Sequence, residues 1–240
     1  MSHSDQFFYH RSERGIIRHR SQVYGRSILG APLELFLPPD PADFDTLVIA
    51  GHHGSEAEGT VLLSSMLRTL KPAHLRCGVI TAINPDGLFR GTRCNAAGVD
   101  LNRNFPSSDW SPNPVMYRFN TEEPQNTRLS PGIHAASEPE TVALLELIDR
   151  LRPKRILSLH APLACIDDPR LSDYGRRLAD ETNLPLVGDV GYDTPGSFGT
   201  WANENDIHLI TVELPVASQQ EIRNLYSQVF LKVMQEKFQD

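Results

Sequence analysis

The chain has 240 residues, 40% of them hydrophobic and 22% charged, which predicts a globular, soluble α/β protein with one domain over residues 1–240. Its net charge of −7 argues against nucleic acid or an anionic membrane as the main partner. The sequence shows no secretory signal, no apolar run of transmembrane length and no disulfide framework among its three cysteines, so we expect a cytoplasmic protein.

Predicted strands and helices alternate in the first part of the chain. The run 32–38 alternates enough for a strand, and the short apolar runs 46–51 and 77–84 predict strands buried on both faces. Apolar residues at helical spacing, with acids in the first turn, predict a helix over 55–70. The tetrapeptide "NPDG" at 84–87 predicts a turn that stops the third strand.

The alternation continues to the C-terminus. Residues 137–151 predict a helix with a capping box from Ser137 to Glu140 and with Pro139 in its first turn. The remaining expected elements are strands at 155–161, 185–192 and 207–215 and helices at 169–182 and 218–238. Such alternation predicts a single α/β domain whose mostly parallel mixed sheet is covered by helices on both faces.

Residues 106–136 form a long segment that is rich in proline and asparagine and shows no clear periodicity. Loops of this length in compact domains tend to be functional or disordered. We interpret the segment as a wall over the site, and the alternative is a surface insertion without a role.

Four polar residues stand near the ends of predicted strands. His53 and Glu56 follow the strand 46–51, His160 ends the strand at 155–161, and Glu213 lies near the end of the last strand. Ligands of open α/β sheets bind beyond the carboxyl ends of the strands, so we expect these side chains to meet at one edge. An H-x-x-E pair alone is a weak signal, and a polar loop is its alternative.

Two imidazoles and one carboxylate form the ligand set typical of catalytic zinc, with a fourth position left for water. Hydrolysis then needs a separate carboxylate as general base, and Glu213 is the candidate. A carboxylate in an apolar strand could instead pair with an arginine. His52 is not expected to be a ligand, because only His53 has the x-x-Glu spacing.

The stretch "GTRCNAAGVDLNRNF" at 91–105 is also dense in polar side chains, among them Arg93, Asp100, Asn102 and Arg103. The planar guanidinium of arginine suits bidentate capture of a carboxylate. The alternative is a solvated turn, since asparagine, glycine and aspartate are good turn formers.

These motifs together resemble the zinc carboxypeptidase family. "HGSE", "NPDG", "GVDLNRNF", His160 and "TVELP" follow the order and rough spacing of that family, and the resemblance runs from about residue 24 to 235. It implies a zinc carboxypeptidase-like fold and a hydrolase that holds one Zn²⁺ through His53, Glu56 and His160.

The resemblance also implies roles for the arginines and for Asn102. Asn102 and Arg103 would clamp the free terminal carboxylate of the substrate. Arg93 would stabilise the negative charge that develops on the carbonyl oxygen, and Arg90 is a rival for that role because members of the family differ in spacing here.

Three further roles follow from the resemblance. Asp100 would orient His53 through the ring nitrogen that faces away from the metal. Glu213 would act as general base and then as general acid. Tyr192, nine residues before Trp201, would match a mobile tyrosine of the family that closes on the substrate.

A closer resemblance concerns bacterial members of the family that act on cell-wall peptides, through "YGRSILGAPL", "HAPLACIDDPR" and "GYDTPGSFGTW". It implies an amidase that cuts the γ-D-glutamyl–meso-diaminopimelate bond of murein tripeptide, a small-molecule substrate. The distal end of diaminopimelate is a zwitterion, so its pocket should offer both charge signs. Asp189 and Asp193 are candidates for binding its ammonium group.

Two other functions remain open from the sequence. One is a zinc deacylase of N-acylated amino acids, against which the wall segment and the Tyr192–Trp201 block argue. The other is a non-catalytic binder of murein peptides, which would not need Glu213. The oligomeric state is not predicted.

Overall fold

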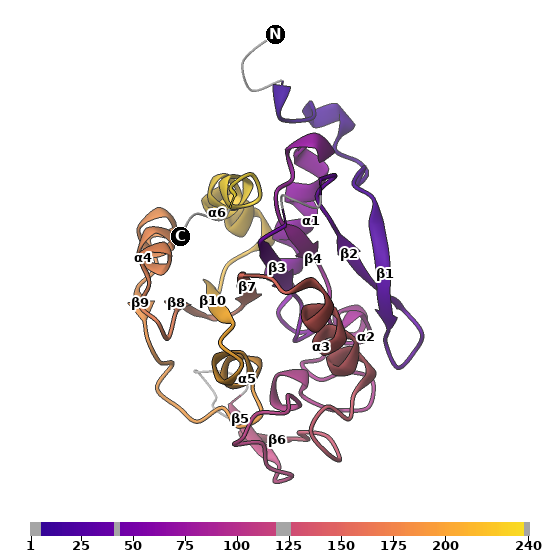
Figure 1. The fold of residues 1–240 in the computed structure, drawn as a ribbon, viewed down its shortest axis with the longest axis vertical. Coiled ribbons are helices and arrows are strands. Elements are labelled where there is room, and N and C mark those ends of the chain that lie inside the picture. Colours follow the sequence, from indigo (N-terminus) through magenta and orange to yellow (C-terminus); the bar gives the residue numbers. More distant parts are fainter. Residues whose placement is uncertain (1–5, 41–43, 119–125, 238–240) are drawn as a thin grey trace.

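The computed structural model describes residues 6–40, 44–118 and 126–237, and Figure 1 shows its fold. The strands of the main sheet are β1 Ser21–Arg26, β2 Pro32–Phe36, β3 Thr46–Ala50, β4 Gly78–Ile80, β7 Arg155–His160, β8 Leu163–Asp167, β9 Leu186–Val187 and β10 His208–Pro215. Their order across the sheet is β1-β2-β4-β3-β7-β10-β8-β9. A separate hairpin joins β5 Val115–Arg118 and β6 Asn126–Leu129.

The centre of the sheet is parallel and its flanks include antiparallel pairs. Strands β4, β3, β7 and β10 run parallel, whereas β1, β2 and β8 pair antiparallel with their inner neighbours. Every residue of β3 and β7 is buried, as expected of strands covered on both faces. The predicted α/β class with a mixed sheet is therefore confirmed.

Helices cover both faces of the sheet (Figure 1). They are α1 Ala57–Thr69, α2 Pro85–Arg90, α3 Pro139–Leu151, α4 Asp173–Thr182, α5 Phe198–Glu204 and α6 Gln219–Val233. One apolar core joins the sheet to α1, α4 and α6, and the other joins it to α3 and α5. Within the described residues, every helix is too short or too polar to cross a membrane.

The predicted capping box of α3 is wrong. Glu138, not Ser137, is the N-cap residue, and its side chain caps no backbone N–H of the helix. The carboxylate of Glu140 accepts hydrogen bonds from the Ile28 amide (3.1 Å) and Asn95 Nδ2 (3.3 Å). The Glu140 carboxylate is therefore bonded by donors from other parts of the chain, and it does not cap the helix as the local pattern predicted. Pro139 does stand at the start of the helix as predicted.

The "NPDG" segment begins a helix and is not a simple turn. The Asn84 side chain accepts a hydrogen bond from the Gly87 amide (2.8 Å) and caps α2, with Pro85 in the first turn. The preceding strand is correspondingly short, because it ends at Ile80.

The segment 106–136 contains the β5–β6 hairpin and returns beside the "DLNRN" motif. The Asp100 amide donates to the Ser130 carbonyl (2.9 Å), and the Ala136 amide donates to the Asn104 carbonyl (2.6 Å). Residues 119–125, within the predicted wall, lie outside the described residues.

Candidate active site

Parallel strand register brings the predicted polar residues to one edge of the sheet. His160 is the last residue of β7, and Glu213 of β10 lies directly opposite it in the parallel ladder. On the other side of β7, β3 ends at Ala50, and the chain then passes through His53 and Glu56 into α1. Residues far apart in sequence therefore meet as expected.

His53, Glu56 and His160 form a buried group whose ligand atoms all lie within 4.8 Å of one another. His53 Nδ1 is 2.8 Å and His160 Nδ1 is 3.0 Å from the Glu56 carboxylate oxygens. The His53 Nδ1 atom is buried, and within the described chain it has no partner with hydrogen-bond geometry. Two imidazoles and a carboxylate that converge in this way suit Zn²⁺, so the group could hold a metal ion.

Asp100 orients the His53 ring. Its Oδ1 atom lies 3.0 Å from His53 Nε2, and its Oδ2 atom accepts from Arg93 Nε at 2.9 Å. Burial raises the Asp100 pKa, but Arg93 and His53 outweigh it and hold that pKa well below its usual range. The buried carboxylate therefore stays ionised and turns Nδ1 of His53 toward Glu56.

Arg93 borders the candidate metal site. Its Nη1 atom donates to Glu56 Oε1 at 3.0 Å, and its guanidinium lies 4.1 Å from the centre of the Tyr117 ring. Tyr117 belongs to β5, so the segment predicted as a wall does border the site. Arg90 is exposed in the last turn of α2, and of the two arginines it is Arg93 that contacts Glu56 and Asp100.

Glu213 is a buried carboxylate next to His160. Only 9% of the residue is exposed, and its Oε2 atom accepts from the Leu163 amide at 3.4 Å. Burial raises the pKa of the Glu213 carboxyl group, and the neighbouring Glu56 carboxylate raises it further. His160 lowers this pKa, but the net effect is an increase. No ion pair among the described residues joins Glu213 to an arginine, so the pairing considered from sequence receives no support.

Asn102 and Arg103 lie in a 3₁₀ turn, Leu101–Arg103, next to the ligands. Asn102 Oδ1 accepts from the Phe198 amide (2.8 Å), which fixes the side-chain amide. Arg103 is 6% exposed, and its Nε atom has no hydrogen-bond partner among the described residues. A buried guanidinium with an unused donor is suited to binding an anion.

Tyr192 is 55% exposed, and its hydroxyl feels the charges of Glu213 and Arg103. Partial burial raises its pKa, Glu213 raises it further, and Arg103 lowers it.

His52 is 1% exposed and stacks on His160 with ring centres 5.3 Å apart. Among the described residues, the group that could hold a metal contains His53 but not His52.

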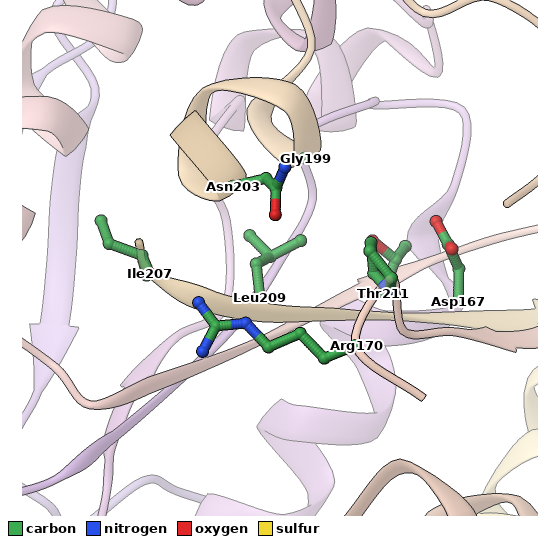
Figure 2. Close-up of a pocket in the computed structure, with 8 residues that line it drawn as sticks. Asp167, Arg170, Gly199, Asn203, Ile207, Leu209 and Thr211 are labelled. Atoms are coloured by element: carbon green, nitrogen blue, oxygen red, sulfur yellow. The ribbon is translucent and has the colours of Figure 1, made fainter. Parts of the chain in front are cut away.

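A small cavity of about 20 Å³ lies between α5 and strands β8 and β10 (Figure 2). It is lined by Asp167, Pro169, Arg170, Gly199, Asn203, Ile207, Leu209 and Thr211. Sequence reasoning did not single out any of these residues. The paired acids in "CIDDP", directly after a short apolar run, were the available signal. Asp189 and Asp193, which it did single out, are both exposed.

The zinc carboxypeptidase family profile matches residues 22–166, which is more than half of the chain. The chain belongs to the zinc carboxypeptidase family. Two relatives within that family are named murein peptide amidase A. The protein from Escherichia coli (strain K12) is 47% identical over 217 residues, 90% of each chain. The protein from Vibrio campbellii is 41% identical over 226 residues, 94% of this chain and 91% of the relative.

Two solved structures share this fold. The murein-tripeptide amidase from Escherichia coli O157 superposes with a TM-score of 0.93 at 44% identity, covering 97% of this chain and 99% of the other. Bovine thrombin-activatable fibrinolysis inhibitor is only 19% identical. Its TM-score of 0.70, over 90% of this chain and 88% of the other, shows a shared fold alone.

Proposed function

We propose that this protein is a zinc-dependent amidase that hydrolyses the γ-D-glutamyl–meso-diaminopimelate bond of murein tripeptide. The observation that carries the proposal is the convergence of His53, Glu56 and His160 beside the buried carboxylate of Glu213. The 47% identity to murein peptide amidase A supports this choice of substrate.

His53, Glu56 and His160 would hold one Zn²⁺ per chain. When bound, the ion supplies Lewis-acid polarisation of the scissile carbonyl and of the attacking water. Asp100 keeps His53 in the orientation that this binding requires, because it holds the Nε2 atom at 3.0 Å.

Glu213 moves the proton in the reaction. It takes a proton from the attacking water while the water oxygen bonds to the carbonyl carbon. It then gives that proton to the amide nitrogen as the carbon–nitrogen bond breaks, which releases the γ-carboxyl group and the amine of diaminopimelate. The proton that remains on the carboxyl group passes to the amine, which leaves a carboxylate and an ammonium group. Arg93, 3.0 Å from a Glu56 oxygen, stabilises the negative charge on the carbonyl oxygen. Arg90 remains a rival for that role.

Asn102 and Arg103 bind the free carboxylate on the L-centre of diaminopimelate. To the enzyme this centre is a C-terminal residue, so a carboxypeptidase-like site serves for an amidase. The unused Nε donor of the buried Arg103 supports this role. Tyr192, which is exposed at the edge of the site, closes on the bound substrate.

The chain acts as one catalytic domain over residues 1–240 in the cytoplasm, where murein peptides released from the wall are recycled. A single eight-stranded sheet that spans both apolar cores supports the assignment of one domain. Three free cysteines, Cys77, Cys94 and Cys165, support the cytoplasmic location.

The test is hydrolysis of L-Ala-γ-D-Glu-meso-diaminopimelate by the zinc-loaded protein, the chelated protein and the chelated protein after zinc is returned. We expect release of diaminopimelate only when zinc is present. N-acetylated amino acids serve as the matched alternative substrates. Faster cleavage of these would indicate a deacylase, and binding of tripeptide without turnover would indicate a non-catalytic binder.

A further inference from the structure

Two rows of side chains cross strands β7, β10 and β8 on the face that α5 covers. The row at the sheet edge contains the catalytic candidates His160 and Glu213 together with Cys165. The second row lies two residues further into the sheet, and it consists of Ser158, Thr211 and Asp167. Because strand side chains alternate with a period of two, both rows point to the same face.

The second row is polar, and two of its side chains carry an atom without a hydrogen-bond partner among the described residues. Ser158 Oγ and Asp167 Oδ1 are buried, and neither has a hydrogen-bond partner among the described residues. A buried polar atom without a partner costs free energy, and a carboxylate oxygen costs the most. A row of this kind behind a catalytic centre is suited to receive a polar group of the substrate.

Figure 2 shows the space that such a group would enter. Asp167 and Thr211 stand side by side across from Gly199 of α5, which contributes no side chain to the cavity. The cavity of about 20 Å³ has room for one water-sized group, and an ammonium group has that size. The Arg170 side chain, which also lines the cavity, runs along β10 and bonds Asp206 at 2.9 Å.

The charge around Asp167 favours a cation. Burial, together with the neighbouring carboxylates of Glu213, Asp189 and Asp168, raises the pKa of Asp167 to about 6. Neighbouring carboxylates that disfavour ionisation of Asp167 would be offset by a positive group placed among them. Arg170, the arginine that lines the cavity, is already bonded to Asp206, so the substrate would supply that group.

We propose that Asp167 is the specificity-determining residue of this enzyme and binds the distal ammonium group of diaminopimelate. The proposal rests on the proposed function. Along β10, Thr211 lies about 7 Å from Glu213, since strands rise about 3.4 Å per residue. The two α-carbons of diaminopimelate are roughly 5 Å apart across three methylenes. A substrate whose L-centre lies at Glu213 therefore carries its distal ammonium to the Asp167 row.

This assignment differs from the one suggested by sequence. Asp189 and Asp193 lie on the exposed segment before α5, whereas Asp167 lines the cavity and its Oδ1 atom is buried. A charged hydrogen bond discriminates strongly between two substrates only when the substrate that lacks it leaves a buried group unpaired. Loss of the ammonium group should therefore cost more at Asp167 than at the exposed Asp189 or Asp193.

The test crosses two substrates with two variants. One substrate is the murein tripeptide; the other replaces diaminopimelate with L-2-aminopimelate, which keeps the carbon chain and distal carboxylate but lacks the distal ammonium. The variants are Asp167→Asn and, as matched control, Asp189→Asn. Zinc content and the melting temperature are measured for each protein, together with the affinity of free meso-diaminopimelate.

For the wild type we expect kcat/KM to be roughly 10–100-fold higher with diaminopimelate than with aminopimelate. Asp167→Asn should remove most of that preference and weaken meso-diaminopimelate binding similarly, with zinc retained and the melting temperature not lowered. Asp189→Asn should keep the preference.

If Asp167→Asn keeps the preference, the assignment of Asp167 is wrong while the amidase function stands. If the wild type cuts both substrates equally, the inference also fails, and this result needs no folded variant. If the wild type neither cuts the tripeptide nor binds meso-diaminopimelate, the proposed function fails with it.

Discussion

His53 and His52 are adjacent in the sequence but differ in what their ring nitrogens face. His53 points Nδ1 at Glu56, whereas His52 stacks on His160 between aromatic neighbours. His53→Ala should therefore lose zinc, and His52→Ala should keep one zinc per chain. Metal analysis of the two purified proteins tests this, and zinc lost only from His52→Ala would overturn the ligand assignment.

Asp100 is a second residue whose effect on zinc can be measured without turnover. Its two oxygens hold both His53 and Arg93, so Asp100→Ala frees the ring of a ligand. We expect zinc affinity to fall about 10–100-fold, as is typical when the partner of a ligating histidine is removed.

Competition with a chelating dye gives the zinc affinity of Asp100→Ala. The control is Asp173→Asn, an acid that is fully exposed on α4, and its zinc affinity should equal that of the wild type. Equal affinity in Asp100→Ala would mean that Asp100 does not orient His53.

At the scale of elements, Asp168 joins β8 to the start of α4. The fully buried carboxylate accepts from the Ser172 amide and hydroxyl, the Arg170 amide and His208. Asp168→Ala should lower the free energy of unfolding by about 2–4 kcal/mol, because it leaves several donors unpaired. Urea denaturation measures this, and Asp180→Ala, an exposed acid of the same helix, should change it by less than about 0.5 kcal/mol.

The same pair of proteins gives a pH dependence. Burial raises the Asp168 pKa, but hydrogen bonds from His208 and Ser172 lower it to about 2. An unfolded aspartate titrates near 3.9, so the stabilisation is complete above that value and is lost as the pH falls toward 2. The stability gap between wild type and Asp168→Ala should narrow from pH 6 to pH 3. A gap that stays constant would contradict this origin.

The central strands were predictable because each combines a short apolar run with burial on both faces. Strand β8 was not predicted, because the chain reverses between His160 and Leu163 without a glycine or asparagine to mark the turn. Helix α5 was missed although Ser197 caps it by accepting from the Thr200 amide. A glycine in a seven-residue helix hides the helical period.

At the scale of the whole molecule, the convergence of His53, Glu56 and His160 could be predicted because the carboxyl ends of parallel strands meet at one edge. Asp167 could not, because its importance depends on the antiparallel pairing that sets it opposite Thr211. No local pattern encodes the register between β8 and β10.

The arrangement of the site around the sheet edge also predicts which murein peptides are cut. Arg103 is buried and its Nε atom has no partner among the described residues, so we expect the free carboxylate of tripeptide to complete its hydrogen bonding. In tetrapeptide, D-Ala caps that carboxylate as an amide, and about 3 kcal/mol of the interaction is lost. We expect tetrapeptide to be cut roughly 100-fold more slowly. Similar kcat/KM values for both peptides would mean that Arg103 is not a carboxylate clamp.

The central claim is that Glu213 performs proton transfer at a zinc site in an amidase. The most direct test compares Glu213→Gln with the wild type on murein tripeptide, with zinc measured in the same samples. We predict one zinc per chain in both proteins, unchanged tripeptide binding, and a kcat at least about 10²-fold lower in the variant. A Glu213→Gln protein that holds zinc and turns over tripeptide at the wild-type rate would contradict the account.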